Sequence, residues 1–463
     1  MLGNTTKERY REYQRRMCPM NLKLSARIER IRSSLFFTPM VFVLAGIVIG
    51  QVAVTIDVRT AEGASRLPLG FTSTVESARA VVSTIAAATI TVAGIAFSIS
   101  LLVIQLASSQ YSPRVVHSLF RDPTNKRLMG MVVGTFSYCL VVLRSVRGTV
   151  EDGGEPVVPN LSVGLAVILG IVAILAILYF IDHSARSMDI SEILHRITER
   201  SIRLADESWP LANPDFDPPE PPQAVPDDER CLVVRFHDDG WIERFEADAL
   251  LDLTSDGGTV RFETRPGRYA MNGAPLCTVW PAPDDADAVS SRARDAVEVG
   301  TSRTSQQDIE YGIRQLADVG IRALSPGVND PTTAQDAIFH IAAVLGELLR
   351  RDSPPRVRRD EGGRRLLLPE LPTHADLLHT AFDELRRAAA PHPRVCVYLL
   401  ESLHLLTEVL DGAGLDRRRG LLLGQARLVL AAAEDGGSTE ADLREVKEAW
   451  AKWFGGDVGH AVG

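Results

Sequence analysis

The chain has 463 residues, which is too long for one ordinary domain, and a formal net charge of −9. This acidic balance excludes nucleic acid as the main partner, because phosphate binding needs a basic surface. The five cysteines lie far apart and have neither zinc-site nor disulfide-framework spacing, so the sequence predicts no metal site and thiols suited to a reducing cytoplasm.

The composition divides the chain near residue 182, with long uncharged runs before it and frequent charge and proline after it. The predicted fold class is four α-helical transmembrane spans followed by a cytoplasmic α+β region, in which a small β-rich module precedes a helical domain. We expect a basic leader over 1–34, the transmembrane domain with a cytoplasmic helical extension over 35–206, an acidic, proline-rich linker over 207–230, the β-rich module over 231–283 and the helical domain over 284–463.

Four runs are apolar enough to cross a bilayer, which takes roughly 20 residues: Leu35–Ile56, Ala80–Pro113, Leu128–Leu143 and Leu161–Ile181. The first follows a leader without a clean cleavage site and is interpreted as a retained anchor. The second would reach roughly 50 Å as a helix, longer than the bilayer is thick, and a break is expected at Ser112-Pro113. The third is short and is held between Arg127 and Arg144.

The distribution of basic residues predicts the orientation of the spans. With the N-terminus inside, Lys and Arg residues at the inner ends of the spans clearly outnumber those in the outer loops. This bias is typical of cytoplasmic flanks, so both termini are expected in the cytoplasm.

The second apolar run carries a polar stripe with a seven-residue repeat. Thr84, Thr91, Ser98 and Gln105 follow this repeat, with Gly94 and Ser108 on the same face. A seven-residue repeat keeps one face turned toward a partner, and lipid solvates such residues poorly. Two interpretations stay open: a packing stripe inside the four-helix unit, or the lining of a polar pore built from several copies. The absence of charged residues from the span cores argues against a proton-coupled pump.

Beyond the spans, Asp182–Asp206 is expected to prolong the fourth helix. Short β-branched runs between turn sequences predict the strands of the β-rich module, with a short helix over Asp248–Leu253. In the helical domain, Thr304 or Ser305 is the expected cap of one helix, and Asp330 that of the next, with Pro331 at its first position. Further elements are expected over Thr332–Leu349, Arg365–Leu368 (a strand), Ala375–Ala389, Pro393–Asp411, Asp416–Ala433 and Thr439–Trp453.

The segment Arg303–Ala334, RTSQQDIEYGIRQLADVGIRALSPGVNDPTTA, resembles a signature of the bacterial membrane proteins grouped as domain of unknown function 2254. The stretches Arg265–Leu276 and Ser108–Arg114 also match, with Ala270-Met271 where the family often has two β-branched residues. The resemblance covers nearly the whole chain. It implies the same architecture and a multi-pass protein of the bacterial inner (plasma) membrane, and it implies no activity.

The signature concentrates polar side chains around one pair of helices. One interpretation is purely structural: a polar network that locks the loop through helix caps and arginine–aspartate pairing. The alternatives are binding of a small anionic ligand at a helix start, or catalysis. The sequence contains no familiar catalytic motif and calls for no cofactor, so it favours a protein that is not an enzyme. The candidate ligand-binding or gating residues are Arg303, Gln307, Asp308, Arg322, Ser325, Asn329, Asp330 and Thr332.

Two functions follow from these observations. The leading hypothesis is a homo-oligomer in the lipid bilayer whose second spans surround a small-ion pore, gated by the cytoplasmic domain. The alternative is a membrane-anchored sensor or scaffold that binds a small ligand or a protein through the helical domain, without transport.

Overall fold

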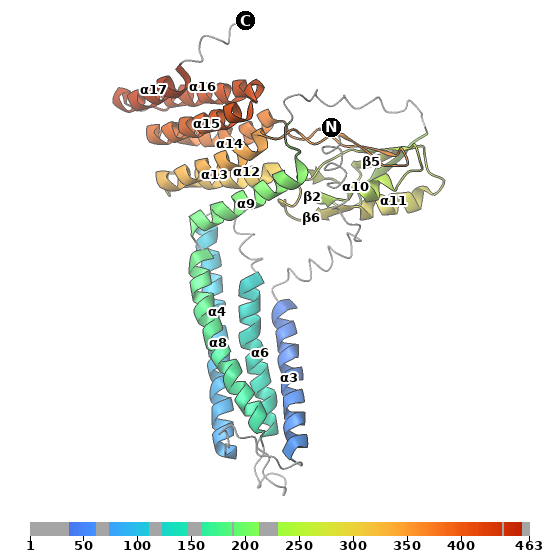
Figure 1. Ribbon diagram of the computed structural model, residues 1–463, viewed down its shortest axis with the longest axis vertical. Coiled ribbons are helices and arrows are strands. Elements are labelled where there is room, and N and C mark those ends of the chain that lie inside the picture. The colour runs from blue at the N-terminus through green and yellow to red at the C-terminus, as the bar shows by residue number, and fades with distance from the viewer. Residues whose placement is uncertain are drawn as a thin grey trace, which may run out of the picture. The chain divides into compact units, whose positions relative to one another are not determined.

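The computed structural model describes residues 37–61, 74–110, 123–146, 159–187, 189–212, 230–437 and 439–455. The chain forms two compact units, a four-helix unit within residues 28–192 and a C-terminal unit from Ile193 onward. Figure 1 traces both units, and each is described here by itself.

The four-helix unit confirms the four predicted spans, each a helix long and apolar enough to cross a membrane. The third helix is 23 residues long, more than its apolar run alone indicated, because it includes the polar turn that precedes Leu128. The second helix has 36 residues. The expected break at Ser112-Pro113 lies outside the described residues. The four helices are α3 (Phe37–Ala61), α4 (Val75–Gln110), α6 (Pro123–Ser145) and α8 (Asn160–Ser187).

Two glycine pairs bring α3 and α6 into close contact. Gly46 and Gly50 lie one turn apart in α3, and Gly130 and Gly134 lie one turn apart in α6. A Cβ atom at Gly46 would lie 2.3 Å from the carbonyl oxygen of Gly134, and one at Gly134 would lie 2.8 Å from the carbonyl oxygen of Phe42. Glycines at this spacing let two membrane helices approach until their backbones touch. A side chain at Gly46 or Gly134 would therefore collide with the backbone of the facing helix.

A polar contact fastens the end of α3 to the start of α8. The Asp57 carboxylate accepts hydrogen bonds from the backbone N–H groups of Leu161 (3.1 Å) and Ser162 (2.8 Å) and from the Ser162 hydroxyl (2.5 Å). The Tyr138 hydroxyl of α6 donates to the Ser162 carbonyl at 2.9 Å. The first N–H groups of a helix have no partner within it and favour a negative charge nearby. Asp57 supplies both the acceptor and the charge.

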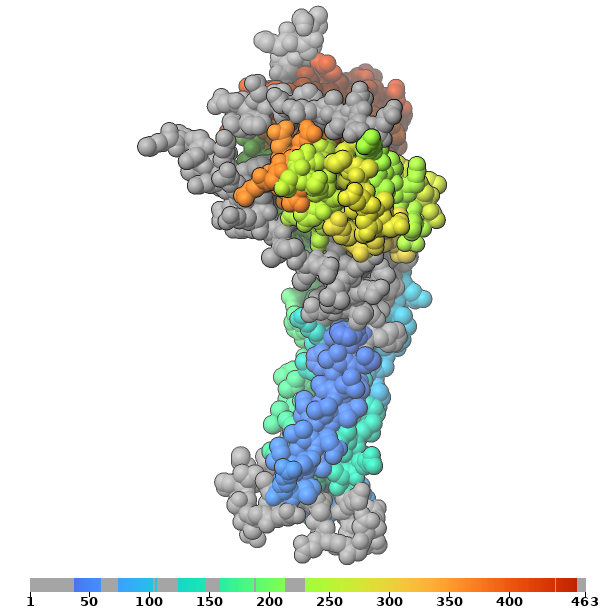
Figure 2. Space-filling model, turned by 90° about the vertical axis from the view of Figure 1, so that its right-hand side faces the viewer, coloured from blue at the N-terminus to red at the C-terminus, as the bar shows by residue number. Residues whose placement is uncertain are grey.

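The outer surface of this unit is apolar. Figure 2 shows α3 (blue) along the face turned toward the viewer. Its exposed side chains include Met40, Leu44, Ile47, Val48 and Val52. A surface of this kind suits contact with lipid chains.

The expected continuation of the fourth span is wrong in one respect, because two helices occupy the segment. Helix α8 ends at Ser187 and α9 spans Ile190–Ser208. The Asp189 carboxylate accepts a hydrogen bond from the Ser191 N–H at 3.0 Å and so caps the new helix. Helix α9 is amphipathic and buries Ile193, Leu194, Ile197 and Leu204 in the C-terminal unit. Residues 213–229, most of the expected linker, are not described.

Two small sheets share one core in the C-terminal unit. The five-stranded sheet has the order β1-β5-β3-β8-β7, in which only the β3–β8 pair is parallel, and the antiparallel three-stranded sheet has the order β4-β2-β6. The core includes Val234, Ile242, Phe262 and Val279. Strands β6, β7 and β8 come from beyond residue 283. The strands are β1 (Leu232–Arg235), β2 (Gly240–Phe245), β3 (Thr259–Phe262), β4 (Tyr269–Ala270), β5 (Pro275–Trp280), β6 (Val297–Gly300), β7 (Val357–Arg359) and β8 (Arg365–Leu367).

Helices make up the rest of the C-terminal unit. Figure 1 shows them stacked in layers, with α12 and α13 in one layer, α14 and α15 above them, and α16 and α17 outermost. The small helices α10 and α11 lie against the sheets. Their bounds are α10 (Ala247–Leu251), α11 (Ala286–Asp295), α12 (Ile309–Ala323), α13 (Pro331–Leu349), α14 (His374–Ala389), α15 (Pro393–Ala413), the 3-10 turn η1 (Asp416–Arg418), α16 (Arg419–Asp435) and α17 (Glu440–Phe454).

Candidate functional sites

The polar stripe of α4 lies on its exposed side. Thr84, Thr91, Gly94, Ser98 and Gln105 are all exposed in the single chain, whereas the side chain of Ser108 lies outside the described residues. The helix packs against its own unit through a different set of residues, spaced three, four or seven apart: Ala78, Val82, Ala86, Thr89 and Ala96. At 3.6 residues per turn these two sets fall on opposite faces of the helix. Packing inside one copy therefore does not account for the stripe.

Three hydroxyl groups of the stripe donate within the helix and keep their oxygens available as acceptors. The hydroxyls of Thr84, Thr91 and Ser98 donate to backbone carbonyls one turn earlier, at 2.7, 2.8 and 3.0 Å. Each hydroxyl oxygen still has acceptor capacity. A Cβ atom at Gly94 would meet no heavy atom within 4 Å, so nothing in this copy requires a glycine there. The stripe is a polar, sterically open surface.

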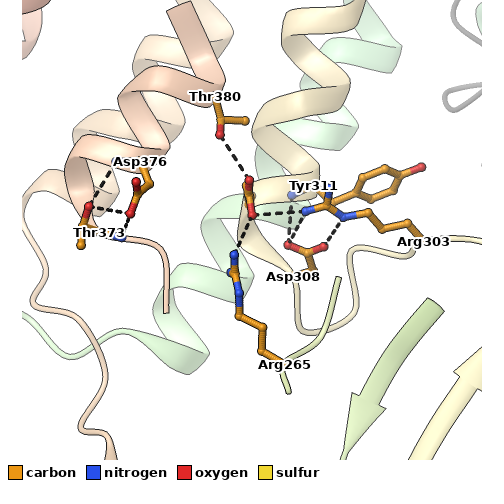
Figure 3. A network of polar contacts seen from close by, with 8 residues as sticks. Arg265, Arg303, Asp308, Tyr311, Thr373, Asp376 and Thr380 are labelled. Carbon is orange, nitrogen blue, oxygen red and sulfur yellow. Dashed lines mark hydrogen bonds and ion pairs between the residues drawn. The ribbon is translucent and has the colours of Figure 1, made fainter. Parts of the chain in front are cut away.

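The first half of the signature forms a buried ion pair at the start of α12. Arg303 donates to both carboxylate oxygens of Asp308, from Nε at 2.6 Å and from an Nη at 3.2 Å (Figure 3). The Asp308 carboxylate also accepts from the Tyr311 N–H, so Asp308 is the N-cap of α12. The expectation of a cap at Thr304 or Ser305 is therefore wrong, because the helix starts four residues after Ser305. The Arg303 guanidinium lies 5.3 Å from the centre of the Tyr311 ring.

This ion pair joins the two signature segments. Glu310 lies 3.4 Å from guanidinium nitrogens of both Arg303 and Arg265, and it accepts from the Thr380 hydroxyl of α14 at 3.3 Å. Figure 3 draws these contacts, together with the Thr373–Asp376 capping box that begins α14. The β-rich module, α12 and α14 therefore meet at one carboxylate. Arg265 and Arg303 each begin a signature segment, although no pattern in the sequence pairs either of them with Glu310.

Gln307 binds the backbone of the β-rich module. Its side-chain oxygen accepts from the Phe245 N–H at 3.0 Å, and its amide nitrogen donates to the Phe245 carbonyl at 3.2 Å. The side-chain amide thus pairs with strand β2 as a neighbouring strand would. Gln307 has the role of a structural clamp.

The second half of the signature lies at the far end of α12. Asp330 is the N-cap of α13, accepting from the N–H groups of Thr332 and Thr333 at 3.1 Å and from the Thr333 hydroxyl at 2.6 Å, with Pro331 at the first helical position as expected. Asn329 has a left-handed backbone with φ of 49°, and the Ser325 hydroxyl donates to the Arg322 carbonyl at 2.7 Å. The 15 residues of α12 separate the two halves by roughly 22 Å. The eight signature residues form two local sets.

Different interactions shift the pKa values of the two capping carboxylates, Asp308 and Asp330. Burial raises the pKa of Asp308, and the hydrogen bonds from Arg303 act in the opposite direction. The hydroxyl and backbone N–H of Thr333 lower the pKa of Asp330, which favours the ionised carboxylate that a helix start prefers. Both carboxylates already accept several hydrogen bonds within the chain. Their geometry is that of caps, which favours the loop-locking interpretation.

The four apolar helices and the mixed C-terminal unit define a multi-pass membrane protein. The chain matches the family model described as predicted membrane protein (DUF2254) over residues 32–404, and it belongs to this family. It is 31% identical over 430 residues to an uncharacterized protein of Mycobacterium bovis and to one of Mycobacterium tuberculosis strain H37Rv, a match that covers 92% of this chain and 81% of each relative. No solved structure matches.

Proposed function

We propose that this protein forms homo-oligomers in the bilayer, in which α4 helices of several copies surround a path for small ions. The observation that carries the proposal is the position of the polar stripe. Thr84, Thr91, Ser98 and Gln105 lie on the face of α4 turned away from the rest of its own unit. A face of this kind needs either water or another copy beside it.

The cost of leaving this face in lipid supports the proposal. The Gln105 amide has two N–H donors and a carbonyl acceptor, and apolar lipid offers these groups no partner. Exposed hydrocarbon side chains on the same helix, such as Phe97 and Leu102, suit lipid instead. When copies assemble with the stripe inward, the polar groups gain water or each other as partners. Uncharged hydroxyls and amides along a narrow path favour conduction of small ions over tight ion binding.

Gly94 adds a second argument for contact between copies. Glycine costs about 1 kcal/mol relative to alanine in a helix interior. Apart from the backbone of its own helix, no described atom of the same copy lies within 4 Å of the position that a Cβ atom would occupy. A neighbouring helix at close range offsets this cost, as small residues do in other membrane helix pairs.

Flux measurements on purified protein in liposomes test the proposal. We expect passage of small ions above that of empty vesicles, and we expect Ser98→Leu and Gln105→Leu to reduce it at least about tenfold, because each replaces a polar lining group by a bulky apolar one. The matched control is Phe97→Leu, adjacent to Ser98 and exposed outside the stripe. Its flux should equal that of the parent protein.

Two outcomes would reject the pore. The first is flux no greater than that of empty vesicles across a range of voltage and pH. The second is equal loss of flux in Phe97→Leu and Ser98→Leu, which would point to damage to the helix.

The alternative, a membrane-anchored sensor or scaffold, gains less support. It requires the candidate residues of the signature, above all Arg322, Asn329 and Asp330, to offer their polar groups to a ligand or a protein. Arg303 and Asp308 are paired with each other, and Asp330 holds the first turn of α13. The polar stripe on α4 has no role in this alternative.

A further inference from the structure

An apolar groove runs between α13 and α15 of the C-terminal unit. Its floor contains small residues of α13, Ala342, Ala343 and Gly346, and its wall contains Leu405 and Val409 of α15. The hollow measures about 390 Å³ and is open to solvent. The ion pair between Glu347 and Arg350 lies along one rim.

The shape of the groove suits a protein side chain better than a small molecule. Small-molecule sites bury most of their ligand and place a few convergent polar groups around it. This hollow is wide open, and the polar groups of Glu347 and Arg350 are paired with each other. Small residues along one helix face instead make room for the side chains of a neighbouring helix.

The same unit carries an apolar ridge on α16. Leu421 and Leu428 lie two turns apart and are 37% and 40% exposed, with the exposed Gly424 between them. Helix α16 belongs to the outermost layer and is separated from α13 by α15 (Figure 1). The ridge and the groove are therefore two different surfaces of one copy.

Charges beside the two surfaces are complementary. Arg427 projects next to the ridge, is exposed, and forms no ion pair among the residues that the structure describes. Glu408 lies beside the groove wall on α15, with a side chain 62% exposed. Opposite charges at the rim of an interface favour one pairing and orientation of the partners.

We propose that the α16 ridge of one copy packs into the α13–α15 groove of a second copy. The inference rests on the proposed homo-oligomer and identifies the contact that its C-terminal units make. Because the two surfaces differ, the contact is head-to-tail, and repeated head-to-tail contacts close into a ring when the rotation permits. A ring is the arrangement that places one helix of every copy around a common axis.

Disulfide cross-linking between two differently tagged copies tests the contact in the full-length protein in the membrane. One copy carries Ala343→Cys in the groove and the other carries Gly424→Cys in the ridge, both in a background with Cys18→Ser and Cys231→Ser. Gly424 has space for a side chain, since no atom lies within 4 Å of its Cβ position. We expect a cross-linked dimer that contains both tags, since a disulfide requires Cα atoms within about 7 Å.

The control pairs Gly424→Cys with Met271→Cys, an exposed position on the β-rich module, and should give no such dimer.

A second measurement uses the double variant Leu421→Glu, Leu428→Glu. We expect its ratio of oligomer to monomer, measured by mass photometry, to fall about tenfold, because the contact would bury unpaired carboxylates. Val328→Glu, at an exposed position outside both surfaces, should leave the ratio unchanged.

The outcomes separate this inference from the proposed function. Ion flux and intact oligomers without the mixed cross-link would overturn the ridge-and-groove contact alone. Cross-links between two Ala343→Cys copies only would also overturn it, since the groove would then face a second groove. A protein that is monomeric in the membrane would overturn both proposals.

Discussion

Gly267 lies where the two signature segments touch. Its backbone has a φ of +82°, and a Cβ atom would lie 2.0 Å from a carboxylate oxygen of Asp308. Asp308 cannot move away easily because it holds Arg303 and caps α12. The glycine is thus required both by the backbone conformation and by the neighbouring carboxylate.

A pair of glycine substitutions separates these two requirements. Gly257→Ala, at a φ of +76° with open space around it, should cost only the strain of a left-handed residue, about 1–2 kcal/mol. Gly267→Ala adds the displacement of Asp308 and should cost at least about 3 kcal/mol. Thermal unfolding of the full-length protein in detergent measures the difference, and equal losses in the two variants would show that the Asp308 contact contributes nothing.

His374 gives the C-terminal unit a dependence on pH. Its Nε2 lies 3.2 Å from the Leu348 carbonyl oxygen and 3.0 Å from that of Arg351, at the end of α13. Burial lowers the pKa of His374, and the nearby Arg418 lowers it further. The neutral imidazole is therefore the native form, and unfolding takes up a proton below the ordinary histidine pKa of about 6.5.

The stabilising contribution of neutral His374 should be complete above pH 7 and should decrease as the pH falls toward 5. We expect the unfolding midpoint of the parent protein to decrease over this interval, and that of His374→Gln to decrease less. At pH 7 the midpoint of His374→Gln should already be lower than that of the parent, because the variant loses the packing against Trp209. His237→Gln, at an exposed position, serves as the control and should keep the parent slope. If the unfolding midpoint of His374→Gln changes with pH as much as that of the parent protein, other groups cause the pH dependence.

At the scale of elements, the crossing of α3 and α6 depends on backbone contact. Gly46→Ala would place a methyl group 2.3 Å from the Gly134 carbonyl oxygen and force the helices apart, at a cost of about 1–3 kcal/mol. Gly164→Ala in α8 meets nothing within 4 Å and should be neutral or slightly stabilising, since alanine is the better helix former. Unfolding midpoints in detergent compare the two, and a tolerated Gly46→Ala would contradict the close crossing.

Most elements could be predicted from local patterns. The four apolar runs, the strand at Arg365–Leu367 and the capped start of α13 each carry their signal within a few residues. Two errors have local physical causes. Asp189 caps a new helix within a run of helical periodicity, and Asp308, in place of the expected Thr304 or Ser305, caps α12.

Contacts between distant segments could not be predicted in the same way. No local pattern indicates that Arg265 shares Glu310 with Arg303, or that β8 pairs in parallel with β3 across about a hundred residues. The seven-residue polar stripe of α4 can be recognised in the sequence, but the sequence does not show whether that face of the helix is buried or exposed. Periodicity defines a face, and only the packing of the other helices determines whether that face is buried or exposed.

At the scale of the whole molecule, we propose that all four apolar helices cross the bilayer, which puts the segments before the first and after the fourth on the same side. The distribution of Lys and Arg residues favours the cytoplasm for that side. A membrane-impermeant thiol reagent applied to intact cells tests this proposal. Ser65→Cys, between the first two spans, should be labelled from outside, whereas Ser438→Cys in the C-terminal unit should be labelled only after the cells are opened.

The background for this test lacks Cys18 and Cys231, because the remaining native cysteines are buried. Labelling of Ser438→Cys in intact cells would reverse the orientation and leave the number of spans unchanged. Labelling of both positions from outside would instead require an even number of crossings between them, which contradicts the three spans that follow Ser65. Either outcome bears on the proposed pore, since gating by a cytoplasmic C-terminal unit requires that unit to lie on the inner side.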